Sequence, residues 1–390
     1  MKIYDYNHIK KLYVIGDVHG EFKELFNYIK VNGLSYNKES FKEELHPLEV
    51  QEQEERQEEE CNIFNPFGSR HRMKSVAYND SVIIVCGDCG FGFNKAQYYF
   101  DLLGKANELF STTNTHLLFV RGNHDDPSYF DGETINLSNI KAIPDYSIVI
   151  TSKYNTLCVG GAISVDRIWR KQQEVRLNKY SSSKSKRLYW DDEAPILNEN
   201  LIEELKDNNI SINSVVTHTS PSFVYPIQKD SSLGWLKIDK NLNDDIKKER
   251  DIMDKLYNLL LKNNIKINFW AYGHFHNNFE EYKDGTAFVA LCESPHSLTN
   301  IDSSYQRMKD NWEYNNQKKN RKVKKPNNPS DVMSISISDL IANGNIIRDT
   351  NFIRQDNVDN PRHVEHMDDM LEAIDELIHH NENDVDEAPF

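Results

Sequence analysis

Short runs of β-branched, aromatic and aliphatic residues recur from the N-terminus to about residue 298, and each run is followed by a turn that carries Asp, His, Asn or Gly. A polar or helix-like segment then leads to the next run. This alternation predicts an α/β domain in which helices bury the strands of a sheet. The strand-like runs are residues 12–15, 82–86, 116–120, 156–160, 213–217, 267–272 and 286–291.

Residues 21–32 have helical rather than strand periodicity. The apolar side chains of Phe22, Leu25, Phe26 and Ile29 are spaced three or four residues apart, which places them on one face of a helix. This helix would follow the first predicted strand. Because ligands of α/β sheets bind beyond the carboxyl ends of strands, we expect the functional residues in the turns that follow the runs.

Residues 43–60 interrupt the pattern, since they are almost entirely acidic or amide-bearing. Such a segment cannot bury enough apolar surface to fold independently. We expect it to be a solvated insertion between the first helix and the second strand.

The composition changes again after about residue 300. Residues 317–325 are basic and precede a proline, which indicates a linker, and residues 331–341 alternate like a strand. We therefore predict a main domain over 1–300 and a small appendage over 301–390. Apolar residues near the C-terminus have helical spacing, and we expect this helix to pack on its own domain, with contact to a protein partner as the alternative. They are Val364, Met367, Met370, Leu371, Ile374 and Leu377.

The chain has 390 residues and a formal net charge of −15 at pH 7. An anionic protein repels phosphate backbones and anionic lipids at long range, which argues against a general nucleic-acid or membrane surface. A phosphate-bearing substrate would need a local positive centre. No apolar run reaches membrane length and no signal-like apolar segment follows the first residues, so we expect a cytoplasmic protein.

The chain has five cysteines, an odd number without the repeated spacing of a zinc site. Cys86 and Cys89 form a C-x-x-C pair. Because Gly87 and Asp88 lie between them, a turn after a strand explains the pair better than a redox role.

The stretch GDVHG, residues 16–20, follows the first strand-like run. In an extended chain, side chains two residues apart point to the same side, so Asp17 and His19 could converge beyond the end of the strand. Carboxylate and imidazole form a metal-ligand pair. A turn stabilised by Asp and Gly is the alternative interpretation of this stretch alone.

Four later stretches place similar residues at predicted strand ends. A single His there is more often structural, but five such stretches in one chain favour a shared site. The later stretches are CGDCGFG at 86–92, VRGNHDD at 120–126, VVTHTSP at 215–221 and AYGHFHN at 271–277. Their candidate residues are Asp88, Asn123, His124, His218, His274 and His276.

In this order the five stretches resemble the calcineurin-like metallophosphoesterases, whose signature is GD-x-H, GD, GNH-D/E, a lone H and GH-x-H. The resemblance covers about residues 12–298, fills every ligand position, and is closest to the bacterial and phage branch. It implies a β-sandwich flanked by helices, with a dinuclear metal site at the carboxyl ends of the strands. The resemblance implies that Asp17, His19 and His276 hold one ion, that Asn123, His218 and His274 hold the other, that Asp88 bridges both, and that His124 stays unligated beside the substrate.

Two divalent ions about 4 Å apart activate a bridging water and clamp phosphoryl oxygens as charge develops. Asp17 and Asp88 would supply two negative charges against four positive ones, which provides the local positive centre that an acidic chain needs. Oxygen and imidazole ligands without thiolate suit manganese, iron or zinc better than calcium. We expect manganese, with iron or zinc as alternatives.

His124 is the candidate acid that protonates the leaving oxygen. Phosphoprotein phosphatases have GD-x-V-D-R-G in the second block, and Phe91 and Gly92 occupy the Asp and Arg positions here. This departure weakens a Ser/Thr phosphoprotein phosphatase assignment and leaves open which residue orients His124. The candidates for the missing phosphate contact are Arg121, Arg167 and Arg170.

The leading hypothesis is a phosphomonoesterase. A phosphodiesterase or nuclease of the same superfamily is the alternative, and nucleic acid is not favoured because the chain is acidic and its clear basic stripe lies at 317–325. A catalytically inactive metal scaffold that binds protein partners is a third hypothesis. It is disfavoured because neither a ligand position nor the free histidine is lost.

Overall fold

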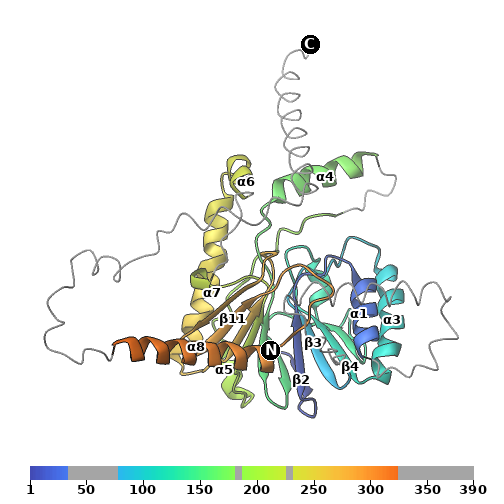
Figure 1. Ribbon diagram of the computed structural model, residues 1–390. Helices are drawn as coiled ribbons and strands as arrows, with labels where there is room; N and C mark the ends of the chain where they lie inside the picture. The colour runs from blue at the N-terminus through green and yellow to red at the C-terminus, as the bar shows by residue number, and fades with distance from the viewer. Residues whose placement is uncertain (34–77, 181–186, 225–231, 324–390) are drawn as a thin grey trace, which may run out of the picture. The chain divides into compact units, whose positions relative to one another are not determined.

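The computed structural model describes residues 1–33, 78–180, 187–224 and 232–323, which form two β-sheets with helices against them (Figure 1). The smaller sheet has five strands in the order β12-β2-β3-β4-β5, of which β2 to β5 are parallel and β12 is antiparallel. Its strands are β2 (Lys11–Ile15), β3 (Ser81–Val85), β4 (Thr115–Phe119), β5 (Ile140–Ala142) and β12 (Thr299–Asn300).

The larger sheet has seven strands in the order β1-β6-β7-β8-β9-β11-β10. The run β7-β8-β9-β11 is parallel, and β10 pairs with β11 in antiparallel orientation. Its strands are β1 (Ile3–Tyr6), β6 (Ser147–Thr151), β7 (Asn155–Val159), β8 (Ser214–Thr217), β9 (Phe269–Tyr272), β10 (Phe279–Lys283) and β11 (Thr286–Ala290).

The two sheets pack face to face, and the alternation of side chains along β2 indicates this arrangement. Leu12 and Val14 belong to a hydrophobic cluster that also contains residues of the larger sheet. Tyr13 and Ile15 point to the other side and belong to the cluster beneath the helices. Because successive strand residues face opposite ways, an unbroken apolar run signals a strand that is buried on both faces.

Helices cover the outer face of each sheet (Figure 1). α1 (Phe22–Gly33) and α3 (Ala96–Thr112) bury their apolar faces against the smaller sheet. α5 (Leu201–Asp207) and α7 (Leu242–Lys262) do so against the larger one. The helical spacing of the buried residues explains this placement.

Three further helices complete the described fold: α4 (Arg167–Tyr180), α6 (Ser232–Ile238) and α8 (Ile301–Val323). Short 3-10 turns lie at Pro127–Phe130 and Ser222–Val224. Ile301 and Met308 of α8 are buried in the cluster between the sheets, and the compact unit that contains them runs from Met1 to Asn320. None of the described helices is both long and apolar enough to cross a membrane.

The α/β architecture predicted from the sequence is confirmed. All seven strand-like runs are strands, displaced by at most two residues at either end, and α1 coincides with the predicted helix to within one residue. The strands β1, β5, β6, β10 and β12 were not predicted. The division near residue 300 stays a prediction, and the acidic segment 43–60, the strand-like stretch 331–341 and the C-terminal helix lie outside the described residues.

Candidate metal centre

The five motif stretches all follow the carboxyl ends of neighbouring parallel strands. Asp17, Asp88 and Asn123 come after β2, β3 and β4, which lie side by side in the smaller sheet. His218 and His274 come after β8 and β9, which lie side by side in the larger sheet. Neighbouring parallel strands have their carboxyl ends on the same side of a sheet. The motif side chains of both sheets therefore converge beyond these carboxyl ends.

The candidate ligands form two groups that share Asp88. In the outer group, one ligand atom each of Asp17, His19, Asp88 and His276 lies within 4.8 Å of the others. In the inner group, the same holds for Asp88, His218 and His274. The structure therefore brings these predicted residues together in the grouping that the resemblance implied.

Close contacts define the outer group. The Oδ2 atom of Asp17 lies 3.2 Å from Nε2 of His276, and the Nε2 atoms of His19 and His276 are 3.1 Å apart. On its other side, Nδ1 of His276 lies 3.3 Å from a carboxylate oxygen of Glu293. That contact favours a proton on Nδ1 and leaves Nε2 free to bind a metal ion.

Asn123 joins the inner group through its side-chain oxygen. Oδ1 of Asn123 lies 2.9 Å from Nε2 of His218 and 3.0 Å from Nδ1 of His274. Nδ1 of His218 is 2.7 Å from the carbonyl oxygen of Cys86, so that nitrogen donates and Nε2 is available. Oδ1 of Asp88 lies 3.1 Å from the same Nε2 atom.

Glycines next to the ligands permit this close approach. A Cβ atom on Gly122 would lie 2.0 Å from the backbone nitrogen of Asp88, and one on Gly273 would lie 2.1 Å from Oδ1 of Asp17. Any larger residue at these two positions would displace a carboxylate. The glycines of the GNH and GH-x-H motifs are thus explained by the geometry of the cluster.

Four of the candidate ligands have a left-handed backbone conformation. The φ angles are 47° at His19, 47° at Asp88, 68° at His274 and 48° at His276. Non-glycine residues in this region cost about 1–3 kcal/mol each and persist where the surrounding structure imposes them, often at functional sites. The strain aims these side chains at a common point.

The two carboxylates dominate the electrostatics of the cluster. Burial opposes the charged form of His218, but Asp88 and Asp17 outweigh it and raise the pKa of His218 to about 9. Burial likewise opposes the ionised form of Asp88, yet the neighbouring imidazoles hold the pKa of that carboxyl well below its usual range. For His274, burial and the charge of His218 lower the pKa to about 3. The cluster thus stabilises positive charge close to its carboxylates.

This donor set fits two divalent cations. It offers two carboxylates, four imidazoles and one amide oxygen, without a thiolate. Such mixed oxygen and nitrogen ligands are typical of manganese, iron and zinc sites. The shared carboxylate of Asp88 provides an oxygen for each group.

His124 and Arg170 lie together beside Asp88. The backbone N–H of His124 donates to Oδ1 of Asp88 at 2.8 Å, and Nη2 of the buried Arg170 contacts the imidazole of His124. Arg170 is held in turn by Asp166, whose Oδ1 accepts from Nε at 2.8 Å. Burial lowers the pKa of His124, and Arg170 adds to this effect while Asp88 opposes it.

The other two candidate arginines make their hydrogen bonds elsewhere. Arg121 is buried and donates to Asp145 at 2.9 Å and to the backbone carbonyl of Glu193 at 2.9 Å. Arg167 pairs with Asp239 at 2.5 Å and with Asp245 at 2.8 Å. Of these three arginines, Arg170 is the one whose guanidinium contacts the imidazole of His124.

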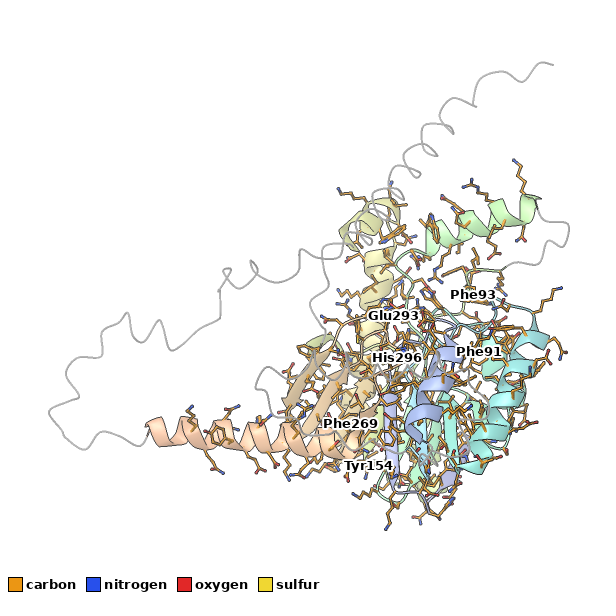
Figure 2. The ribbon with its side chains drawn as sticks, turned by 45° about the vertical axis from the view of Figure 1, so that its right-hand side comes forward. Phe91, Phe93, Tyr154, Phe269, Glu293 and His296 are labelled. Carbon is orange, nitrogen blue, oxygen red and sulfur yellow. The ribbon has the colours of Figure 1, made fainter. Side chains whose placement is uncertain are left out.

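Phe91, at the position where phosphoprotein phosphatases have Asp, packs into the core instead. Its side chain, labelled in Figure 2, is fully buried. The centroid of its ring lies 5.1 Å from that of Tyr99 and 5.2 Å from that of Phe22. The Asp88 loop is therefore anchored by aromatic packing beneath α1 and α3.

The sequence model of the calcineurin-like phosphoesterases matches residues 10–278. The chain belongs to this family. It is therefore a metal-dependent phosphoric ester hydrolase, and the family binds a dinuclear metal site of the kind that the Asp and His groups can form.

Two solved structures show low identity to this phosphoesterase. A phosphopantetheinyl hydrolase from Mycobacterium tuberculosis is 13% identical, with a TM-score of 0.30, over 75% of this chain and 96% of that one. A structure described as a 5'-nucleotidase from Staphylococcus aureus is 13% identical, with a TM-score of 0.28, over 73% of this chain and 48% of that one. No curated protein sequence matches the chain.

Sequence reasoning did not single out several residues that support the site of this phosphoesterase. Asp125 accepts backbone hydrogen bonds from Cys89, Gly90, Phe91 and Gly122 at 2.7–3.0 Å and so ties two motif loops together. Its place in the GNHD stretch was a usable signal. Glu193 and Glu293 lie in no motif, so only the folded chain shows that they belong to the site.

Proposed function

We propose that this phosphoesterase is a phosphomonoesterase with two divalent ions, most simply manganese. The observation that carries the proposal is the convergence of all seven predicted ligands in two groups that share Asp88, with His124 and Arg170 beside them. Asp17, His19 and His276 would hold one ion, and Asn123, His218 and His274 the other.

When bound, the two ions would lower the pKa of a water molecule and neutralise phosphoryl oxygens. The chain supplies the remaining functions. Backbone N–H groups fix both carboxylates: that of His274 donates to Asp17 at 3.0 Å, and that of His124 to Asp88 at 2.8 Å. Arg170 offers donors for a phosphate oxygen, which suits the extra negative charge of a monoester.

His124 is proposed to give the leaving oxygen its proton. A guanidinium can only donate hydrogen bonds, so the contact of Arg170 with His124 favours a neutral imidazole on His124 before substrate binds. In the proposed complex, a dianionic phosphate engages Arg170 and its negative charge favours the protonated form of His124. If this exchange does not occur, His124 instead positions phosphate by hydrogen bonding.

The test measures how fast the manganese-loaded enzyme hydrolyses p-nitrophenyl phosphate, bis(p-nitrophenyl) phosphate and supercoiled plasmid. We expect kcat/KM to be highest for the monoester. The Asp88→Asn variant should lose the activity, which would show that the hydrolysis takes place at this site. Preferential diester cleavage or plasmid nicking would overturn the monoesterase proposal while leaving phosphoesterase activity intact.

Helix α4 favours one alternative, a phosphodiesterase that acts on nucleic acid. It carries five Lys or Arg residues and one acidic residue, and Lys171 and Arg176 are exposed. This basic segment was not recognised in the sequence. Its charge is reduced because Lys171 pairs with Asp191 at 2.8 Å and Arg167 pairs with two carboxylates. For this reason we rank the alternative second.

A further inference from the structure

A buried chain of hydrogen bonds begins at Asn123 and leads away from the cluster. Nδ2 of Asn123 donates to Oγ of Ser164 at 2.9 Å, and that hydroxyl contacts Oε2 of Glu193 at 2.5 Å. All three residues are at most 2% exposed. Ser164 and Glu193 belong to loops before α4 and before α5, so three separate parts of the chain meet here.

The direction of each bond follows from its donors. The Ser164 hydroxyl accepts from Asn123, so its own proton goes to Glu193. The other oxygen of Glu193 accepts from the backbone N–H of Ser164 at 3.0 Å and from the hydroxyl of Tyr189 at 3.2 Å. Glu193 therefore accepts three bonds through a carboxylate, and a chain of donors points from Asn123 toward a negative charge.

This series of hydrogen bonds determines which end of the Asn123 amide faces the cluster. An amide presents either an acceptor oxygen or a donor NH2 group, and only the oxygen can bind a cation. Because Ser164 takes the NH2 end, Oδ1 is left facing His218 and His274. Without this anchor the amide could rotate and present N–H groups to the same space.

The loop that carries Glu193 has other anchors. The backbone carbonyl of Glu193 accepts from Arg121 at 2.9 Å and from the N–H of Ala162 at 3.1 Å. These contacts hold the loop without its carboxylate. The path of the Glu193 loop is therefore held independently of the carboxylate, which is turned toward Ser164 and Tyr189.

We propose that Ser164 and Glu193 are positioning residues that fix Asn123 as a ligand of the inner group. This inference rests on the proposed dinuclear site. It states that the two residues act on the affinity of one ion through Asn123, without touching substrate or metal.

The test measures manganese binding by titration calorimetry and by metal analysis after dialysis, at pH 8, where Glu193 is ionised because burial raises its pKa only to about 7. Ser164→Ala should weaken one of two binding events about 10- to 100-fold and leave the other near the wild-type value. Glu193→Gln, which keeps the side-chain shape, should weaken the same event less strongly. When Co²⁺ replaces manganese in the protein, its absorption spectrum should differ between the same variants and the wild type, because one ligand changes orientation.

Ser214→Ala is the matched control. Ser214 is a fully buried serine whose hydroxyl bonds Thr156 at 2.7 Å, at the opposite end of β8 from His218. It should bind both ions as the wild type does. If the wild type binds two ions and the Ser164 and Glu193 variants bind both with unchanged affinity, the positioning role is wrong and the dinuclear proposal stands. A wild type that does not bind two ions overturns the proposed function itself.

Discussion

The outer and inner ligand groups share Asp88 but differ in their surroundings. In the outer group, the side chains of His276 and His19 are 47% and 19% exposed, and Glu293, which supports His276, is 46% exposed. In the inner group, His218 is fully buried and Asn123 is 2% exposed. The outer group holds both carboxylates, whereas the inner group has one carboxylate, two imidazoles and an amide.

This difference indicates that the two halves are stabilised in different ways. The outer group attracts a cation mainly through charge, and its supporting carboxylate is open to water, which screens it. The inner group depends on orientation, because buried hydrogen bonds to Cys86 and Ser164 fix the His218 ring and the Asn123 amide before a metal ion arrives. We therefore expect the outer ion to exchange with solvent faster than the inner ion.

The largest effect should come from Asp88→Asn, which alters the one residue common to both groups. Loss of the shared negative charge should weaken both ions and reduce kcat/KM by about 1000-fold or more, since bound metals supply several kcal/mol of transition-state stabilisation. Metal analysis and kinetics check this together. Two ions per chain with full turnover would show that Asp88 does not join the groups.

His124→Ala tests a residue that lies beside both groups and belongs to neither. Both ions should be retained, because the ligands are untouched. General acid catalysis is worth about 100- to 10,000-fold, so hydrolysis of alkyl phosphates should fall by that factor. Nitrophenyl phosphate should lose markedly less, because nitrophenolate leaves without a proton. Equal losses on both substrates would instead indicate that His124 positions phosphate or stabilises transition-state charge.

Glu293→Gln should separate the two groups. The variant removes the carboxylate that faces Nδ1 of His276, so the affinity for the outer ion should fall about 10-fold, at the low end of effects of such supporting residues because Glu293 is half-exposed. The inner ion should remain. Glu280→Gln is the control, since Glu280 is a partly exposed carboxylate paired with Arg307 on β10 and α8. If Glu293→Gln changed the affinity for both ions, or for neither, the proposed difference between the two groups would be wrong.

The sequence was sufficient for those parts of the site that local pattern encodes. Asp17 and Asp88 follow apolar runs that are buried on both faces, and short runs of this kind, rich in β-branched residues, are typical of interior strands. Strand β10, by contrast, reads FEEYK and lies at a sheet edge with partly exposed side chains, so it lacks the apolar signal. Strand β12 has two residues, too few for any periodicity.

The supporting residues could not be predicted, because they act through contacts between distant segments. Ser164 lies 41 residues from Asn123 in the sequence, and Glu193 a further 29. No spacing rule relates such positions. Arg121 illustrates the reverse case: its place beside the GNH motif suggested phosphate binding, but the fold directs it to Asp145 and the Glu193 loop.

The smallest effect concerns a histidine that belongs to neither group. His116 lies on β4, the strand that leads to Asn123, and it lacks the carboxylate partners that raise the pKa of His218. Burial, followed by the charges of His8 and Lys141, lowers the pKa of His116 to about 4. The comparison of His116 with His218 thus separates the effect of burial from that of the carboxylates.

Because the folded-state pKa of His116 lies below its unfolded value of about 6.5, the unfolded chain takes up a proton first as pH falls. The free energy of unfolding should therefore decrease from pH 6.5 toward pH 4, by roughly 1.4 kcal/mol at pH 5.5 from this residue. His116→Gln cannot titrate and should lose this part of the pH dependence, while manganese binding at pH 8 stays unchanged. Urea unfolding at pH 7.5 and 5.5 measures the difference between variant and wild type. If that difference is the same at both pH values, His116 does not titrate with a lowered pKa, and burial alone is not enough to suppress the charge of a histidine in this fold.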